Sequence, residues 1–214
     1  MGTPQTGELP VGQTAAHRAP QATRMLAWAG VDGQRLEAAR VVLGERSLRA
    51  SGSLVNTRHE GTEVYFASYS LATDNAGVAQ RLAVRTTWAH GEQYLTLTRS
   101  EEDLWLVDYQ LDQGARTLRT HFGGALDVDL AFSPLFPALP IRRLGLHRDP
   151  AQHDLTAVFI SLPALEVDYV QQTYRTISVG EPTVVSVTNE VFTTDLMVDT
   201  DGLVIDYPGL THRT

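Results

Sequence analysis

Two aspartates separated by a single residue are the clearest candidates for chemistry. Asp127 and Asp129 belong to the run Leu-Asp-Val-Asp-Leu, and in an extended strand both carboxylates point to one face, about 7 Å apart. Carboxylates placed in this way could ligate a metal ion or act as general acid and base. Arg142 and Arg143 follow later in the chain and could instead pair with them as a structural ion-pair cluster. We favour the structural interpretation, because ion-pair networks also perturb carboxylates that have no catalytic role.

A second group of side chains could line a ligand cavity. Gln172 and Tyr174 alternate along the chain, so a strand would place them on the same face. Trp88 and Tyr207 combine apolar surface with a polar tip, which suits an amphipathic ligand. Packing in the core is the alternative role for each aromatic residue.

Several common chemistries are absent from the sequence. The chain contains neither cysteine nor lysine, which excludes thiolate nucleophiles, cysteine-bound metals and Schiff-base lysines. It has no Gly-x-Ser-x-Gly elbow, no glycine-rich nucleotide motif and no paired zinc histidines. The run Asp199-Thr200-Asp201-Gly202 lacks the later ligands of a calcium loop, so we predict a hairpin turn there. We therefore expect no catalytic residues, no metal and no cofactor.

The charge and hydropathy of the chain restrict its partners and its location. The formal net charge is −8 and no basic block is present, so nucleic acid is not an expected partner. Apolar residues make up 43 % of the sequence, which is enough for a globular core, but no run is long enough to span a membrane. The N-terminal region has no apolar core of the kind found in export signals. These features predict a cytoplasmic protein without a transmembrane segment.

The dominant hydrophobic period after Gln34 is two, which is typical of β-strands. The runs rich in β-forming residues cover 82–88, 94–98, 104–109, 155–160, 183–188 and 192–198. Residues 196–198 and 203–205 flank the Asp-Thr-Asp-Gly turn and form the clearest hairpin. Only residues 34–40 favour a helix, through their Leu-Glu-Ala-Ala stretch. Three prolines, at positions 134, 137 and 140, restrict what we take to be a loop between two strands.

These elements predict an all-β protein with one domain. We expect a loosely ordered tail over residues 1–23 and a single β domain over residues 24–214. Short connections favour one large, strongly curved antiparallel sheet or half-open barrel with few short helices. Curling would produce a concave face on which a ligand could bind.

Three segments resemble the putative glycolipid-binding family of small bacterial proteins: DVDLAFSPLFPALPIRRL, LPALEVDYVQQTYRTI and LMVDTDGLVIDYPGL. The family's Asp-x-Asp-Leu, Leu-Pro-Ile-Arg-Arg, Gln-x-Tyr and Tyr-Pro motifs match Asp127 and Asp129, Leu139 to Arg143, Gln172 and Tyr174, and Tyr207 and Pro208. The resemblance implies a bent antiparallel sheet, similar to lipoprotein carriers and mycobacterial lipid-binding lipoproteins. It also implies that the concave side would hold an acyl chain or glycolipid.

The leading hypothesis is a non-enzymatic binder of an amphipathic lipid or glycolipid. The concave face would hold the acyl part, and Arg142 and Arg143 with Gln172 and Tyr174 would meet a phosphate or sugar head group. One alternative is an enzyme that uses Asp127 and Asp129 as its working carboxylates. Another is a protein-interaction module that uses an exposed sheet edge.

Overall fold

The computed structural model describes residues 21–57, 63–111 and 114–214, and in these ranges fifteen strands form one sheet. Most of the predicted tail, residues 1–20, lies outside the described residues, and the first strand begins at Ala22. The strands are β1 (Ala22–Gly30), β2 (Arg35–Leu43), β3 (Leu48–Asn56), β4 (Tyr65–Thr73), β5 (Ala79–Trp88), β6 (Gly91–Arg99), β7 (Trp105–Leu111), β8 (Gly114–Thr120), β9 (Asp127–Leu130), β10 (Gln152–Ile160), β11 (Val167–Ser178), β12 (Thr183–Thr188), β13 (Thr193–Val198), β14 (Val204–Tyr207) and β15 (Thr211–Arg213). The strands predicted from the two-residue period are confirmed.

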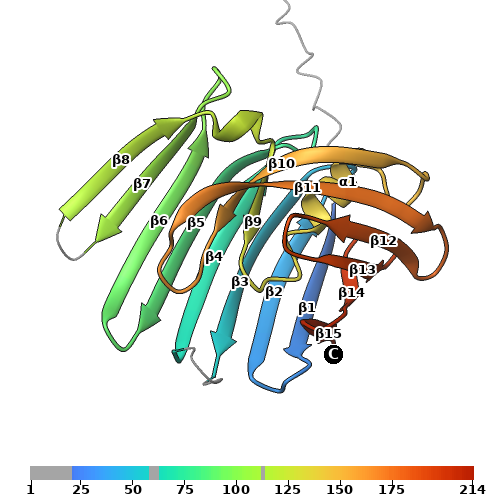
Figure 1. The fold of residues 1–214 in the computed structure, drawn as a ribbon, viewed down its shortest axis with the longest axis horizontal. Helices are drawn as coiled ribbons and strands as arrows, with labels where there is room; N and C mark the ends of the chain where they lie inside the picture. The colour runs from blue at the N-terminus through green and yellow to red at the C-terminus, as the bar shows by residue number, and fades with distance from the viewer. Residues whose placement is uncertain (1–20, 58–62, 112–113) are drawn as a thin grey trace, which may run out of the picture.

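The two edge strands of the sheet, β8 and β9, come from the middle of the chain. The order of strands runs from β8 back to β1, then to β15, and from β15 back to β9 (Figure 1). The first and last strands therefore pair with each other in the middle, antiparallel, and each half of the sheet is a sequential run of neighbours.

One pair of strands departs from the antiparallel pattern that we expected. Strand β9 pairs with β10 in parallel, so the sheet is mixed. A parallel pair needs a long crossover connection. Residues 131–151 provide it, and they include the helix α1 (Ala138–Leu144).

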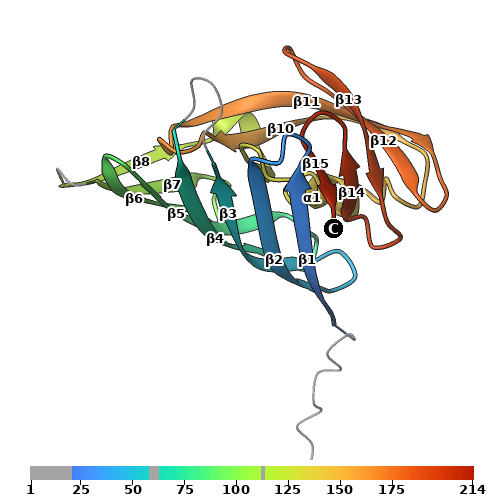
Figure 2. The same cartoon turned by 90° about the horizontal axis from the view of Figure 1, so that it is seen from below.

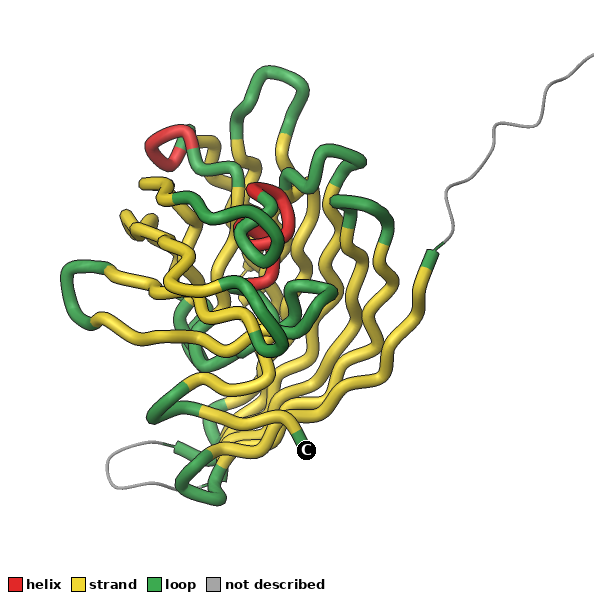
Figure 3. Tube along the Cα trace, turned by 90° about the vertical axis from the view of Figure 1, so that its right-hand side faces the viewer, coloured by secondary structure: helices red, strands yellow, loops and turns green. Residues whose placement is uncertain are grey.

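The sheet is strongly curled but does not close into a barrel, because β8 and β9 remain its two edges. Strands β10 and β11 cross in front of the long N-terminal strands in Figure 1, and Figure 2 shows α1 between these two layers. The Cα trace in Figure 3 shows the same curl from the side, with one helical segment inside it. The predicted strongly curved sheet is confirmed.

The hollow of the N-terminal half is filled by the chain's own side chains. Strand β4 alternates buried and more exposed residues, as a sheet with one inner face must. Its inner residue Tyr69 contacts Phe136, with the ring centroids 5.4 Å apart and the planes at 66°. Leu135, Phe136 and Leu139, from the segment before and within α1, are at most 2 % exposed. The crossover connection is therefore part of the main core.

The predicted helix over residues 34–40 is wrong, since these residues begin strand β2. Leu36 faces outward and Glu37 faces inward, so a buried acid and an exposed leucine concealed the alternation. The three prolines were expected in a loop that leads directly into a strand. The structure instead has the helix α1 (Ala138–Leu144) there. Pro140 lies in the first turn, where a missing N–H is tolerated, and Gly145 ends the helix in the left-handed conformation with φ of 72°.

The Asp-Thr-Asp-Gly run forms the predicted hairpin turn between β13 and β14. The Asp199 carboxylate accepts hydrogen bonds from the backbone N–H groups of Asp201 and Leu203, both at 2.9 Å. The Asp199 N–H in turn donates to the Leu203 carbonyl at 3.0 Å. The aspartate spacing is thus explained by turn geometry.

Candidate functional site

Asp127 forms a buried ion pair with Arg143 of α1. Arg143 Nη2 lies 2.5 Å from Asp127 Oδ2, and Nε lies 3.2 Å from Oδ1, so the contact is bidentate. Asp127 is 1 % exposed, and this burial raises its pKa although the arginine acts in the opposite direction. The pair fixes α1 to the end of β9, which is the structural role that we favoured from the sequence.

Arg142 points to a different part of the fold. Its guanidinium donates to the backbone carbonyls of Asp201, Gly44 and Glu45, and the residue is 4 % exposed. It therefore links α1 to the β13–β14 hairpin and to the turn after β2. Both arginines thus donate within the fold through their Nη groups, and Arg143 also through Nε, while the buried Arg142 Nε has no partner among the described residues.

A groove of about 700 Å³ opens on the concave side of β11 to β13. Its lining comes from residues 129–133 with Pro137, from Phe159 of β10, from residues 168–170, 172 and 174 of β11, from residues 187, 189 and 191–194 of the β12–β13 hairpin, and from residues 207–210 of the β14–β15 turn. Four of the predicted site residues lie together here: Asp129, Gln172, Tyr174 and Tyr207. We call these four the polar floor.

Asp129 is the acidic member of the polar floor. It is half-buried, and Gln172 Nε2 donates to its Oδ2 at 3.0 Å. Loss of solvent raises the pKa of Asp129 to about 6, the hydrogen bond from Gln172 lowers it, and the Asp127 charge adds a smaller increase. Within the described residues no arginine or histidine forms an ion pair with Asp129. Burial rather than coupling to Asp127 is thus the main cause of its shift.

The two tyrosines of the polar floor stay protonated at neutral pH. Burial, followed by the charge of Asp129, raises the pKa of Tyr174 and of Tyr207 above the ordinary value of 10.0. Tyr174 is 2 % exposed, and neither hydroxyl has a hydrogen-bond partner in the part of the chain that the structure describes. Two neutral hydroxyl groups therefore remain available beside the carboxylate.

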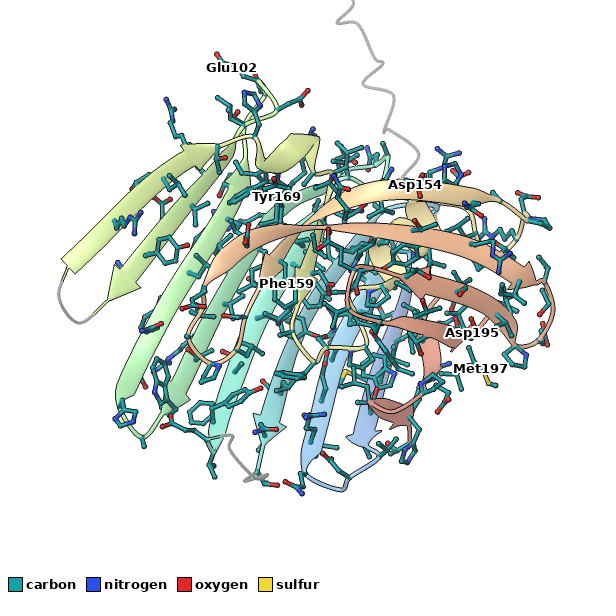
Figure 4. All side chains as sticks on the ribbon, in the orientation of Figure 1. Glu102, Asp154, Phe159, Tyr169, Asp195 and Met197 are labelled. Atoms are coloured by element: carbon teal, nitrogen blue, oxygen red, sulfur yellow. The ribbon has the colours of Figure 1, made fainter. Side chains whose placement is uncertain are left out.

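The mouth of the groove is apolar and exposed. Its large side chains are Phe132, Tyr169, Val191 and Phe192, which we call the apolar rim; Val191, at the tip of the β12–β13 hairpin, is 89 % exposed. Figure 4 shows Tyr169 of β11 and Phe159 of β10 where these strands cross the long N-terminal strands. The groove thus combines a polar, mostly buried floor with an apolar opening.

The remaining predicted site residues do not line the groove. Asp127, Arg142 and Arg143 make the structural contacts described above, and Trp88 lies at the end of β5, paired with Tyr65 and Gly91. The apolar rim was not predicted. The sequence feature that could have indicated it is the pair Val191 and Phe192, because two large apolar residues at a turn between strands suggest an exposed binding surface.

A buried acid that was also missed is hydrogen-bonded to a residue of the groove. Glu37 Oε1 accepts hydrogen bonds from Tyr69 Oη at 2.5 Å and from Ser133 Oγ at 2.9 Å, and Ser133 lines the groove. Burial raises the pKa of Glu37 from 4.5 to about 7. Gly52 pairs with Tyr69 across the strands, and a Cβ there would lie 2.4 Å from the tyrosine ring. Reading residues 34–40 as a strand would have placed Glu37 on the inner face.

Comparison with known proteins gives a family and a fold. The model of a family described as "putative glycolipid-binding" matches residues 25–213. A crystal structure of a DUF1089 family protein from Pseudomonas aeruginosa is similar, with a TM-score of 0.63 and 24 % identity, over 98 % of this chain and 100 % of the other. No curated protein matches the chain. In the described residues, no helix is long and apolar enough to cross a membrane.

Proposed function

Because the chain belongs to the family described as "putative glycolipid-binding", we propose that it binds an amphipathic lipid or glycolipid in the groove and catalyses no reaction. The observation that carries this proposal is the groove itself, with its polar floor, its apolar rim and a volume of about 700 Å³. Small-molecule sites are concave, mainly apolar and contain a few placed polar groups.

The burial of the lining residues supports one orientation of the proposed ligand. Gln172 and Tyr174 are 5 % and 2 % exposed, whereas the residues of the apolar rim are open to solvent. A polar head group would therefore lie deepest and the acyl chain would extend along the rim. Each methylene group that leaves water there contributes about 0.8 kcal/mol.

The head-group contacts that we propose differ from those that the sequence suggested. Arg142 and Arg143 already donate to backbone carbonyls and to Asp127, so releasing them would leave buried polar groups unpaired. We assign the head group to the polar floor instead. This leaves the two arginines with a structural role.

The first test is recovery of the ligand. We expect protein purified under native conditions to carry an amphiphile that organic extraction and mass spectrometry identify. Replacing two residues of the apolar rim, Val191→Asp with Phe192→Asp, should reduce the recovered amount at least several-fold, because each change removes apolar contact area.

The control is a second double variant, Met25→Asp with Val64→Asp. These two side chains are also exposed, at 70 % and 55 %, and neither lines the groove. Equal loss of amphiphile in both double variants would contradict binding in the groove. Absence of any amphiphile from the unaltered protein, together with no change in its melting temperature on adding lipid, would contradict the proposed function.

A further inference from the structure

The groove contains acidic groups and no cationic ones. Of the described residues that line it, two are aspartates, Asp129 and Asp168, and none is arginine, lysine or histidine. Two arginines that contact residues in or next to this lining have other partners. Arg143 pairs with Asp127, and Arg35, which lies over the ring of the groove residue Phe132 at 4.6 Å, donates to Asn56. An anionic head group in the polar floor would thus meet like charge without a counter-charge.

The remaining groups of the polar floor suit hydroxyl groups. An ionised carboxylate accepts hydrogen bonds only, and Asp129 receives one from Gln172 and one from the Leu130 backbone, which still leaves further acceptor capacity. The Tyr174 and Tyr207 hydroxyls can each donate and accept, and Tyr174 is buried without a partner in the described part of the chain. A polyol satisfies such a mixed set of donors and acceptors, whereas an ammonium group supplies donors only.

Building on the proposed function, we infer that the groove selects amphiphiles with an uncharged, hydroxyl-rich head group of the glycosyl type and rejects anionic ones, with Asp129 as the residue that sets this specificity. Hydroxyl groups of the ligand donate to the Asp129 carboxylate. The tyrosine hydroxyls of the polar floor hold the neighbouring hydroxyls. The acyl chain extends to the apolar rim.

The test compares three probes that share one alkyl chain: octyl glucoside, octyl sulfate and octylammonium. Isothermal titration calorimetry below the micelle concentrations gives each affinity, at a pH well above the Asp129 pKa of about 6. We expect octyl glucoside to bind at least about tenfold more tightly than octyl sulfate, since hydrogen bonds to a charged acceptor are the stronger kind.

Variants separate the charge from the shape of the site. Asp129→Asn keeps the volume and removes the charge, so we expect a loss of about tenfold for octyl glucoside and a gain for octyl sulfate. Tyr174→Phe should weaken octyl glucoside without a gain for octyl sulfate. Asp195→Asn is the matched control, because Asp195 is exposed on β13 and does not line the groove (Figure 4). Circular dichroism confirms that each variant is folded.

The outcomes distinguish this inference from the proposed function. The inference is overturned when octyl sulfate or octylammonium binds the unaltered protein as tightly as octyl glucoside. It is also overturned when Asp129→Asn keeps the original preference. Binding of none of the three probes, with no amphiphile recovered from the purified protein, overturns the proposed function as well.

Discussion

Ionisation of Glu37 lowers the unfolding free energy, because its carboxylate is buried inside the sheet. Glu37 is 2 % exposed, and Oε2 has no hydrogen-bond partner among the residues that the structure describes, while Oε1 accepts from Tyr69 and Ser133. Its folded pKa, about 7, lies above 4.5, so the folded state holds the proton more tightly than the unfolded state. The stability that this provides is complete below pH 4.5 and is lost as the pH rises through about 7.

Replacing Glu37 with glutamine should remove this pH dependence. Glutamine keeps the shape and the acceptor oxygen but has no charge to bury. Relative to the unaltered protein, we expect Glu37→Gln to gain roughly 3 kcal/mol of unfolding free energy between acidic and mildly alkaline pH. Urea unfolding across this range measures it, with the exposed Glu101→Gln as control. Parallel pH curves for all three proteins would refute the buried ionisation.

The ion pair of Asp127 with Arg143 gives a second prediction for individual residues. Asp127→Asn leaves a largely buried guanidinium without its anion, and we expect a loss of about 3–5 kcal/mol in unfolding free energy. Adding Arg143→Gln should restore part of this loss, because no unpaired charge remains. The exposed pair of Arg85 with Glu92 is the control, and Glu92→Gln should change stability little. Equal effects of Asp127→Asn and Glu92→Gln on denaturation would contradict the structural role.

Among the elements, the crossover connection before and within α1 stabilises the curl by filling it. Phe136 is 1 % exposed and packs on Tyr69. We expect Phe136→Ala to reduce the unfolding free energy by about 3–5 kcal/mol, since it removes a buried ring and leaves a cavity. Val191→Ala, at an 89 % exposed position, should change it by less than about 0.5 kcal/mol. Chemical denaturation of both variants decides whether this segment belongs to the core.

Strands in which apolar and polar residues clearly alternate could be predicted from the sequence. Elements without this alternation could not. Residues 82–88 and 94–98 show the two-residue period and form parts of β5 and β6. Strand β2 hides its period behind the inward Glu37 and the outward Leu36. Helix α1 has only seven residues and starts among prolines, too short for helical periodicity to appear.

The candidate site was predicted in part, because spacing shows which face a side chain occupies but not what it meets. Gln172 and Tyr174 share a strand face and both reach the groove. Asp127 and Asp129 have the same spacing, yet one meets Arg143 and the other the groove. Arg142 and Arg143 are about 100° apart on a helix, so they bind different partners. These partners come from distant segments that no local pattern reveals.

For the molecule as a whole, the pairing of β1 with β15 joins the two halves of the sheet. His212, in the middle of β15, pairs with Ala29 on one side and Asp206 on the other, and its side chain is exposed. We expect His212→Pro to reduce the unfolding free energy by about 3 kcal/mol or more. Proline has no backbone N–H, so it cannot donate a hydrogen bond to a neighbouring strand in the middle of a sheet. His212→Ala keeps the N–H and should have little effect. Thermal unfolding that fails to separate these two variants would show that the joint is dispensable.

This strand order also has a consequence for synthesis of the chain on the ribosome. Strands β1 to β8 can pair as they emerge, but the outer side of β1 has no neighbour until residues 211–213 have been made. For most of translation the nascent protein therefore presents an open strand edge, of the kind to which other chains add. We expect chaperones to shield this edge until the last strand arrives.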